Sequence, residues 1–162
     1  MDLWRAVLEA GEPHGLIPAG LGARDSLRLE VGYALYGNDL DEEHTPLEAG
    51  LGWVVKLDKG DFVGAEALRR QKAEGVRTRL AGFLMKDRAF PRHGYEVRVN
   101  GAPAGEVTSG VVSPSTGQGV GLAYLPAEAA KPGTAIEIMI RDRAVPAEVV
   151  KPPFYTEGSL RR

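Results

Sequence analysis

In the second half of the chain, short runs typical of β-strands are separated by tight turns, and this pattern constrains the fold most. Between residues 95 and 99 every second residue is apolar, as in a strand with one buried face. The Asn100-Gly101 pair that follows is a strong signal for a two-residue hairpin. Alternation returns at 136–140, with a turn at Asp142-Arg143 and a return run over 144–150. This part of the chain therefore predicts antiparallel strands.

Three further runs complete the predicted sheet. They lie at 79–85, 105–108 and 118–124. About six short strands within about eighty residues predict a small antiparallel β-barrel, closed or nearly closed.

The first half has helical patterns instead. We expect helices over 3–10, from Gly20 to near Gly37, over 45–49 and over 65–73, and one strand over 53–57. The predicted fold class is therefore α+β, a helical segment followed by the barrel. The predicted division is a first domain at 1–75, a barrel domain at 76–155 and a tail at 156–162.

Composition excludes several function classes. The chain has 162 residues, a net charge of −2 and no cysteine, so disulfides and thiolate chemistry are excluded within it. The three histidines, His14, His44 and His93, have no zinc-binding spacing, and we expect no metal site. No dominant basic patch or long apolar run is present, which argues against nucleic acid and membrane partners. No secretory signal is visible at the N-terminus, so we expect a cytoplasmic protein.

The predicted helix after Gly20 carries Arg24 near its start. Leu27, Val31, Ala34 and Leu35 follow at helical spacing, so we expect them to form its apolar face. Asp25 and Arg28 are three residues apart and can pair. On the residues alone, Arg24 is an ordinary exposed helix arginine.

Four other segments contain polar or aromatic groups with two possible interpretations. The acidic run 39–43 predicts a solvated loop, with a hard-cation site as the alternative, and His44 beside it is expected to be exposed. The hydroxyl-rich residues 108–117 are interpreted as turn residues.

The run 88–93 predicts an exposed loop, although it can face an acidic partner or a ligand carboxylate. In the 152–155 segment, Phe154 is expected to pack into the core, and Tyr155 can anchor the chain or present its hydroxyl to a ligand.

Several motifs together resemble the T-protein of the glycine cleavage system, a folate-dependent aminomethyltransferase. They are GLGARDSLRLE at 20–30, LYGNDLD at 35–41, KGDFVG at 59–64, GEVTSGVVSPS at 105–115 and PFY at 153–155. They occur in order over nearly the whole chain, so the resemblance is specific.

The resemblance implies a function. T-proteins take the aminomethyl carbon from the lipoyl group of H-protein, release ammonia and pass the carbon to tetrahydrofolate. Their last domain is a small β-barrel. In this family the arginine of the GLxARD motif contacts folate, which makes Arg24 the first candidate folate-binding residue. A tyrosine close to the C-terminus contacts folate in some members, and Tyr155 is the candidate here. Lipoylated H-protein is the implied partner.

One departure from the family is important. T-proteins are roughly twice this length, and their catalytic aspartate lies in an N-terminal half to which nothing here corresponds. No residue of this chain is assigned a catalytic role. We therefore expect the isolated chain to be inactive, and the missing N-terminal half to be a partner. The first sixty or so residues should then carry an exposed apolar surface.

Related families provide alternatives. Iron–sulfur assembly factors of this architecture carry a KGC-x-GQE motif, whereas this chain has aspartate at position 61. The folate domains of sarcosine and dimethylglycine dehydrogenases are closer rivals. A plain protein- or RNA-binding module is a third possibility.

Overall fold

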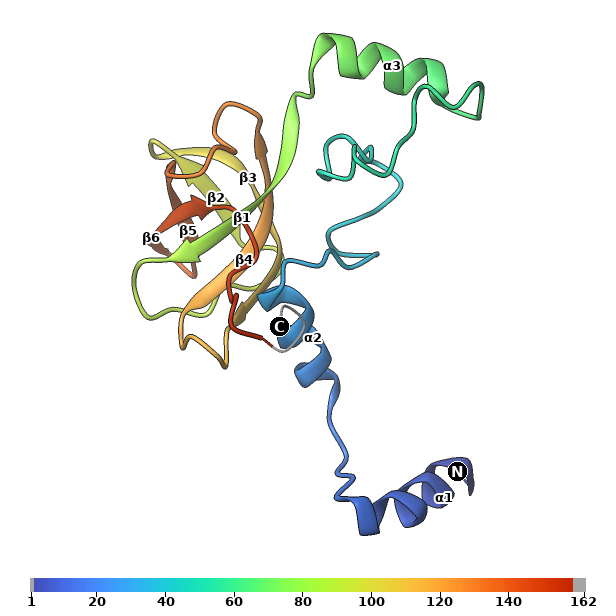
Figure 1. Cartoon of the computed structure of the whole chain (residues 1–162). Coiled ribbons are helices and arrows are strands. Elements are labelled where there is room, and N and C mark those ends of the chain that lie inside the picture. Colours follow the sequence, from blue (N-terminus) through green and yellow to red (C-terminus); the bar gives the residue numbers. More distant parts are fainter. Residues whose placement is uncertain (1, 159–162) are drawn as a thin grey trace.

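The computed structural model describes residues 2–158, which form three α-helices and a closed six-stranded antiparallel barrel (Figure 1). The elements are α1 (Asp2–Gly11), η1 (Glu12–His14), α2 (Leu21–Glu30), α3 (Ala65–Glu74), β1 (Thr78–Met85), β2 (Glu96–Val99), β3 (Ala102–Val112), β4 (Gly119–Pro126), β5 (Ala135–Ile140) and β6 (Arg143–Val150). The predicted α+β class with a small antiparallel barrel is confirmed. Part of the predicted tail, 159–162, lies outside the described residues.

The barrel closes in the strand order β1-β4-β3-β2-β5-β6, and β6 pairs with β1. The β2–β3 hairpin forms where the Asn100-Gly101 pair predicts it. Asn100 has φ 52° and Gly101 has φ 78°, the two positive values that a type I′ turn requires. Because the sheet is closed, it has no free edge that could pair with another strand.

Alternation along the strands divides the apolar residues between two clusters. The barrel interior contains Ala81, Phe83, Met85, Val97, Val107, Ala123, Leu125, Ile136, Ile138, Val145, Ala147 and Val149. On the outside of β4, Val120 and Leu122 pack with Leu29 of α2, and Phe154 packs against them. Strand β4 is therefore buried on both faces, by the barrel core inside and by α2 outside. Phe154 packs as predicted, but against this outer cluster rather than in the barrel interior.

The approach of β3 to β4 leaves no room for a side chain at Gly105. A Cβ atom there would lie 1.9 Å from the carbonyl oxygen of Tyr124. We expect Gly105→Ala to lower the free energy of unfolding by about 1–3 kcal/mol, because backbone must move to relieve the clash. Urea denaturation measures this. Gly22→Ala is the control, since a Cβ in α2 there meets nothing within 4 Å and should be neutral or stabilising. Equal stabilities for the two variants would contradict the prediction.

Helix α2 differs from the prediction in its length and in its buried face. It ends at Glu30 rather than near Gly37, because the chain turns at Gly32, where φ is 78°. Leu27, expected on the apolar face, is 63% exposed, whereas Leu29 is fully buried. The face that contacts the barrel is formed by Ser26, Leu29 and Glu30, so it is mostly polar.

The segment between α2 and α3 is formed of turns. The predicted strand at 53–57 is absent because no sheet edge is available to pair with it, and Trp53 is 73% exposed. The predicted helix at 45–49 is a set of turns, although its capping box forms. Thr45 N–H donates to Glu48 Oε2 at 2.9 Å, and Glu48 N–H donates to Thr45 Oγ1 at 3.3 Å.

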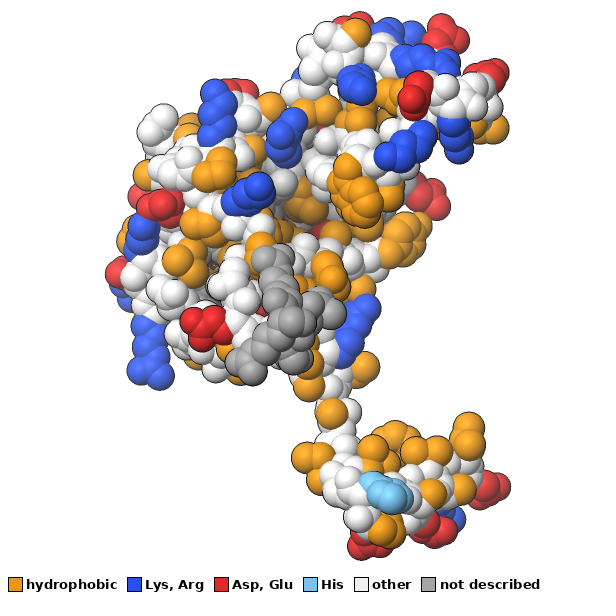
Figure 2. All heavy atoms as spheres, viewed as in Figure 1, with side chains coloured by type: hydrophobic (Ala, Val, Ile, Leu, Met, Phe, Trp, Pro, Cys, Tyr) orange, Lys and Arg blue, Asp and Glu red, His pale blue; other side chains and the backbone are white. Residues whose placement is uncertain are grey.

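The N-terminal elements do not form a core of their own. Helix α1 lies away from the barrel at the end of an extended segment (Figure 1), and none of its residues is buried. Large exposed apolar side chains gather in this part of the chain: Leu3, Trp4, Val7, Leu16, Ile17, Leu21, Leu27, Tyr33, Tyr36, Trp53, Val54 and Val63. Figure 2 shows apolar atoms gathered on α1. Within residues 2–158, no helix has the length and apolarity needed to cross a membrane.

Candidate functional site

Helix α2 is attached to the barrel by an ionic network centred on Arg28. The Arg28 guanidinium donates to Asp25 Oδ1 at 2.6 Å, to Asp39 Oδ2 at 2.8 Å and to Ser109 Oγ at 2.9 Å. The expected Asp25–Arg28 pair is thus present, and it is part of a larger set. Ser109 lies in β3, so Arg28 connects the helix to the barrel wall.

Asp39 is the buried anion of this network, and its side chain is fully inaccessible. Besides Arg28, its carboxylate accepts hydrogen bonds from Leu35 N–H at 2.8 Å, Thr108 Oγ1 at 2.5 Å and Ser109 Oγ at 2.9 Å. Such a set of donors compensates for the loss of hydration of a buried charge. The prediction of a solvated acidic loop is therefore wrong for Asp39. Thr108 and Ser109, interpreted as turn residues, lie in a strand and supply two of these donors.

The loop after Asp39 packs on the barrel through an aromatic stack. The rings of His44 and Tyr124 lie 3.7 Å apart at 8°, so His44 is half-buried and not exposed as expected. Burial, together with the nearby charges of Asp41, Glu48 and Asp39, raises the pKa of Tyr124 to about 12. Its phenol therefore stays protonated and donates to the Asp39 carbonyl oxygen at 3.0 Å.

Glu30 forms a second buried attachment at the end of α2. Its carboxylate accepts hydrogen bonds from Ser113 Oγ at 2.5 Å, from Ser115 N–H at 2.9 Å and from Ser115 Oγ at 3.0 Å. Burial alone would raise the pKa of Glu30, but these hydrogen bonds from Ser113 and Ser115 lower it below its ordinary value. Glu30 is thus held as a carboxylate.

The C-terminal segment is joined to the same helix end. The Glu30 carbonyl oxygen accepts hydrogen bonds from Phe154 N–H at 2.9 Å and Tyr155 N–H at 3.1 Å. The half-buried side chain of Tyr155 is therefore held next to α2. The sequence did not predict this contact, because Glu30 and Tyr155 are far apart along the chain.

Arg24 lies in the first turns of α2, on a surface that the barrel does not cover. Its side chain is exposed and makes no hydrogen bond or ion pair with any residue in the 2–158 range. With a rise of 1.5 Å per residue, Arg24 and Glu30 are about 9 Å apart along the helix axis. The structure thus places both predicted site residues, Arg24 and Tyr155, on or beside one helix that two buried carboxylates hold in position.

The exposed guanidinium of Arg24 gives this arrangement a group that can pair with an anion. The buried carboxylates Asp39 and Glu30 are occupied by donors of the chain itself. Over the described part of the chain, no three His, Asp or Glu residues are grouped so as to hold a metal ion. Sequence reasoning missed Arg28, Asp39 and Glu30 as positioning residues, because their partners in β3 and in the turn after it are about 70–85 residues away.

The comparisons with known proteins point to one family. The glycine cleavage T-protein C-terminal barrel domain family matches residues 78–156, and the GCVT N-terminal domain family matches residues 1–59. An aminomethyltransferase of Halothermothrix orenii is 54% identical over 154 residues, which are 95% of this chain and 43% of that protein. One of Nostoc sp. is 54% identical over 160 residues, which are 98% of this chain and 42% of that protein.

A solved structure is also similar. The crystal structure of glycine cleavage system aminomethyltransferase T from Bartonella henselae matches with a TM-score of 0.81 and 35% identity, over 85% of this chain and 39% of that one. The chain therefore spans less than half the length of the curated relatives it matches.

Proposed function

The chain belongs to the glycine cleavage T-protein family, and on that premise we propose that it supplies one wall of the folate site of an aminomethyltransferase. In the proposed reaction, the aminomethyl carbon passes from the lipoyl group of H-protein to tetrahydrofolate, and ammonia is released. The observation that carries the proposal is the position of Arg24, whose guanidinium has no partner in residues 2–158 and projects from a helix that is firmly attached to the barrel.

The N-terminal turn of α2 suits an anionic ligand. The backbone N–H groups of Leu21 and Gly22 precede the first hydrogen bond of the helix, from Ala23 N–H to the Gly20 carbonyl oxygen at 3.0 Å, and the helix dipole favours negative charge there. Gly22, where a Cβ would meet nothing within 4 Å, leaves this part of the helix open to close approach. We propose that Arg24 binds a carboxylate of tetrahydrofolate and that Tyr155, held at the other end of α2, contributes a second contact.

The remaining parts of the proposal concern organisation. We propose that residues 1–75 are part of the folate-binding domain, that 76–155 form the barrel domain, and that the protein acts in the cytoplasm. The exposed apolar side chains between Leu3 and Val63 support the proposal that another part of a T-protein packs on this chain. They are the surface that packs against the N-terminal half of a T-protein, and we propose that the catalytic carboxylate comes from that half. The chain alone is then inactive.

The alternatives differ in the partner they require. The matched relatives are named aminomethyltransferases, which does not favour a dehydrogenase-linked or iron–sulfur assembly module. A flavin-containing domain attached to the natural protein would favour the dehydrogenase alternative.

Substitution of Arg24 tests the proposed site. We expect Arg24→Ala to weaken binding of 5-formyltetrahydrofolate about tenfold or more, since a charge-assisted contact of over about 1.4 kcal/mol is lost. Calorimetry should be done on this chain joined to the N-terminal part of the Halothermothrix orenii protein that it does not match. Arg70→Ala, an exposed helix arginine in α3, is the control and should leave the Kd unchanged. Equal affinities for the Arg24→Ala variant and the parent would refute the assignment.

A further inference from the structure

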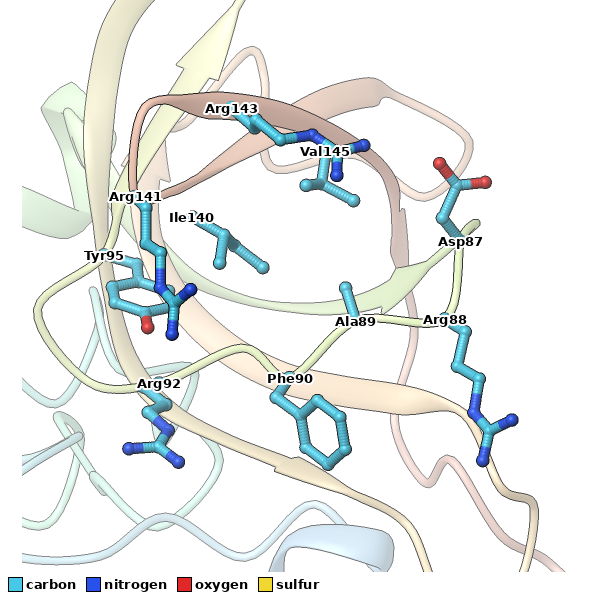
Figure 3. A pocket seen from close by; sticks show the side chains of 10 residues that line it. All are labelled: Asp87, Arg88, Ala89, Phe90, Arg92, Tyr95, Ile140, Arg141, Arg143 and Val145. Atoms are coloured by element: carbon cyan, nitrogen blue, oxygen red, sulfur yellow. The ribbon is translucent and has the colours of Figure 1, made fainter.

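A concave site lies at one end of the barrel, apart from α2. It is a pocket of about 460 Å³ formed by the loop between β1 and β2 and by the β5–β6 turn (Figure 3). The residues that characterise it are Arg88, Phe90, Arg92, Tyr95, Arg141 and Arg143. Its volume lies within the range of small-molecule sites, about 300–1,000 Å³.

The charge of this pocket is opposite in sign to that of the whole chain. Four arginines and one carboxylate, Asp87, line it, whereas the chain has a net charge of −2. None of the five ion pairs found among residues 2–158 includes any of these arginines. The charged side chains that line this pocket are mostly of one sign, so the pocket attracts the opposite charge.

The pocket also has an apolar part. Figure 3 shows Ala89, Ile140 and Val145 between the arginines, with the ring of Tyr95 beside Arg141. Phe90, from the same loop, is 62% exposed. A surface of this kind suits a ligand with a flat apolar body, and arginine guanidinium groups suit carboxylate or phosphate groups attached to it.

We propose that this barrel pocket binds a small organic anion that carries at least two negative charges on an aromatic or otherwise flat apolar body. Carboxylate and phosphate groups share the required chemistry. The site does not include Arg24 or Tyr155 and does not depend on the proposed folate site.

The test is an NMR titration of this 162-residue chain labelled with ¹⁵N. The probes are adenosine triphosphate and benzene-1,3,5-tricarboxylate, each compared with an anion that lacks the ring, tripolyphosphate and citrate. We expect saturable amide shifts confined to the 86–95 and 139–145 segments, with the ring-bearing probe of each pair binding more tightly. Which of the two ring-bearing probes binds more tightly then identifies the preferred anionic group.

Matched variants distinguish binding at this pocket from non-specific attraction by the positive charge of the arginines. Arg141 and Arg143 are exposed, and we expect their double replacement by alanine to weaken binding of the better probe tenfold or more. The control is Arg5→Ala with Arg70→Ala, which removes the same charge from exposed positions on α1 and α3 and should change the Kd less than twofold. Phe90→Ala should weaken only the ring-bearing probes.

Three results would overturn the proposal. They are equal weakening by both double variants, equal affinity for anions with and without a ring, and binding of an oligo-glutamate peptide at least tenfold tighter than either ring-bearing probe. The last result would identify the pocket as a surface for an acidic protein.

Discussion

Asp39→Asn is expected to lower the free energy of unfolding by about 3–5 kcal/mol, the usual effect of removing one partner of a buried ion pair. Asp39 is fully buried, and the Arg28 side chain is 10% exposed. Asparagine keeps the shape but loses the charge, so the Arg28 guanidinium is left without its buried counter-ion. The amide also directs N–H groups at a site where four donors already converge.

Urea denaturation at neutral pH measures this loss. Asp41→Asn is the matched control, because Asp41 is in the same loop and pairs with His44 on the surface at 2.9 Å. Exposed pairs contribute about 0–1 kcal/mol, so its effect should be small. A loss below about 1 kcal/mol for Asp39→Asn would show that the network does not hold α2 on the barrel.

The Asp39→Asn variant also distinguishes a residue that positions α2 from a residue that binds folate. If Asp39 positions α2, its replacement should reduce stability and folate binding together in the assembled protein. Arg24 has no partner in residues 2–158, so Arg24→Ala should reduce binding and leave the free energy of unfolding within about 0.5 kcal/mol. This difference distinguishes a positioning residue from a ligand-binding residue.

The barrel could be predicted from the sequence because its signals are local. Alternation with a period of two marks β2 and β5, and the Asn100-Gly101 pair fixes the hairpin between β2 and β3. Interior positions such as Val97 and Ile138 follow directly from that alternation. Closure of the sheet also explains why the strand predicted at 53–57 does not form. The run has high β-propensity, but the barrel offers no free edge with which it could pair.

Helix α2 could not be placed in the same way because its determinants are not local. Helical periodicity predicted that Leu27 lies on the apolar face, but the face of α2 that contacts the barrel is formed by Ser26, Leu29 and Glu30. The Arg28 side chain attaches the helix through hydrogen bonds to Asp39 and Ser109. A buried polar side chain needs hydrogen-bond partners, and here these come largely from distant parts of the chain. The local sequence does not identify those partners. Arg24 and Tyr155 came from the family resemblance, and their roles in folate binding remain predictions.

The acid stability of the protein should depend on Glu30. The folded-state pKa of Glu30 lies below its ordinary value of 4.5, because hydrogen bonds from Ser113 and Ser115 outweigh the effect of burial. The unfolded chain therefore binds the proton more readily than the folded one. The contribution of Glu30 to stability is complete above about pH 4.5 and is lost as the pH falls through the lower folded-state pKa. Glu48 has a lowered pKa as well, since hydrogen bonds from Thr45 and Thr78 outweigh its burial.

Glu30→Gln isolates this contribution. At pH 7 we expect a loss of about 2–4 kcal/mol, because each hydrogen bond to a charged group contributes about 1.5–3 kcal/mol and glutamine retains only part of three. Between pH 5 and pH 2 the loss should shrink, since the parent protein also loses its carboxylate there. Glu48→Gln should flatten the acid limb in a similar way without releasing α2. Urea denaturation across this range decides the matter: a pH-independent difference between Glu30→Gln and the parent would mean that the carboxylate charge does not hold the helix end to the Ser113–Ser115 turn.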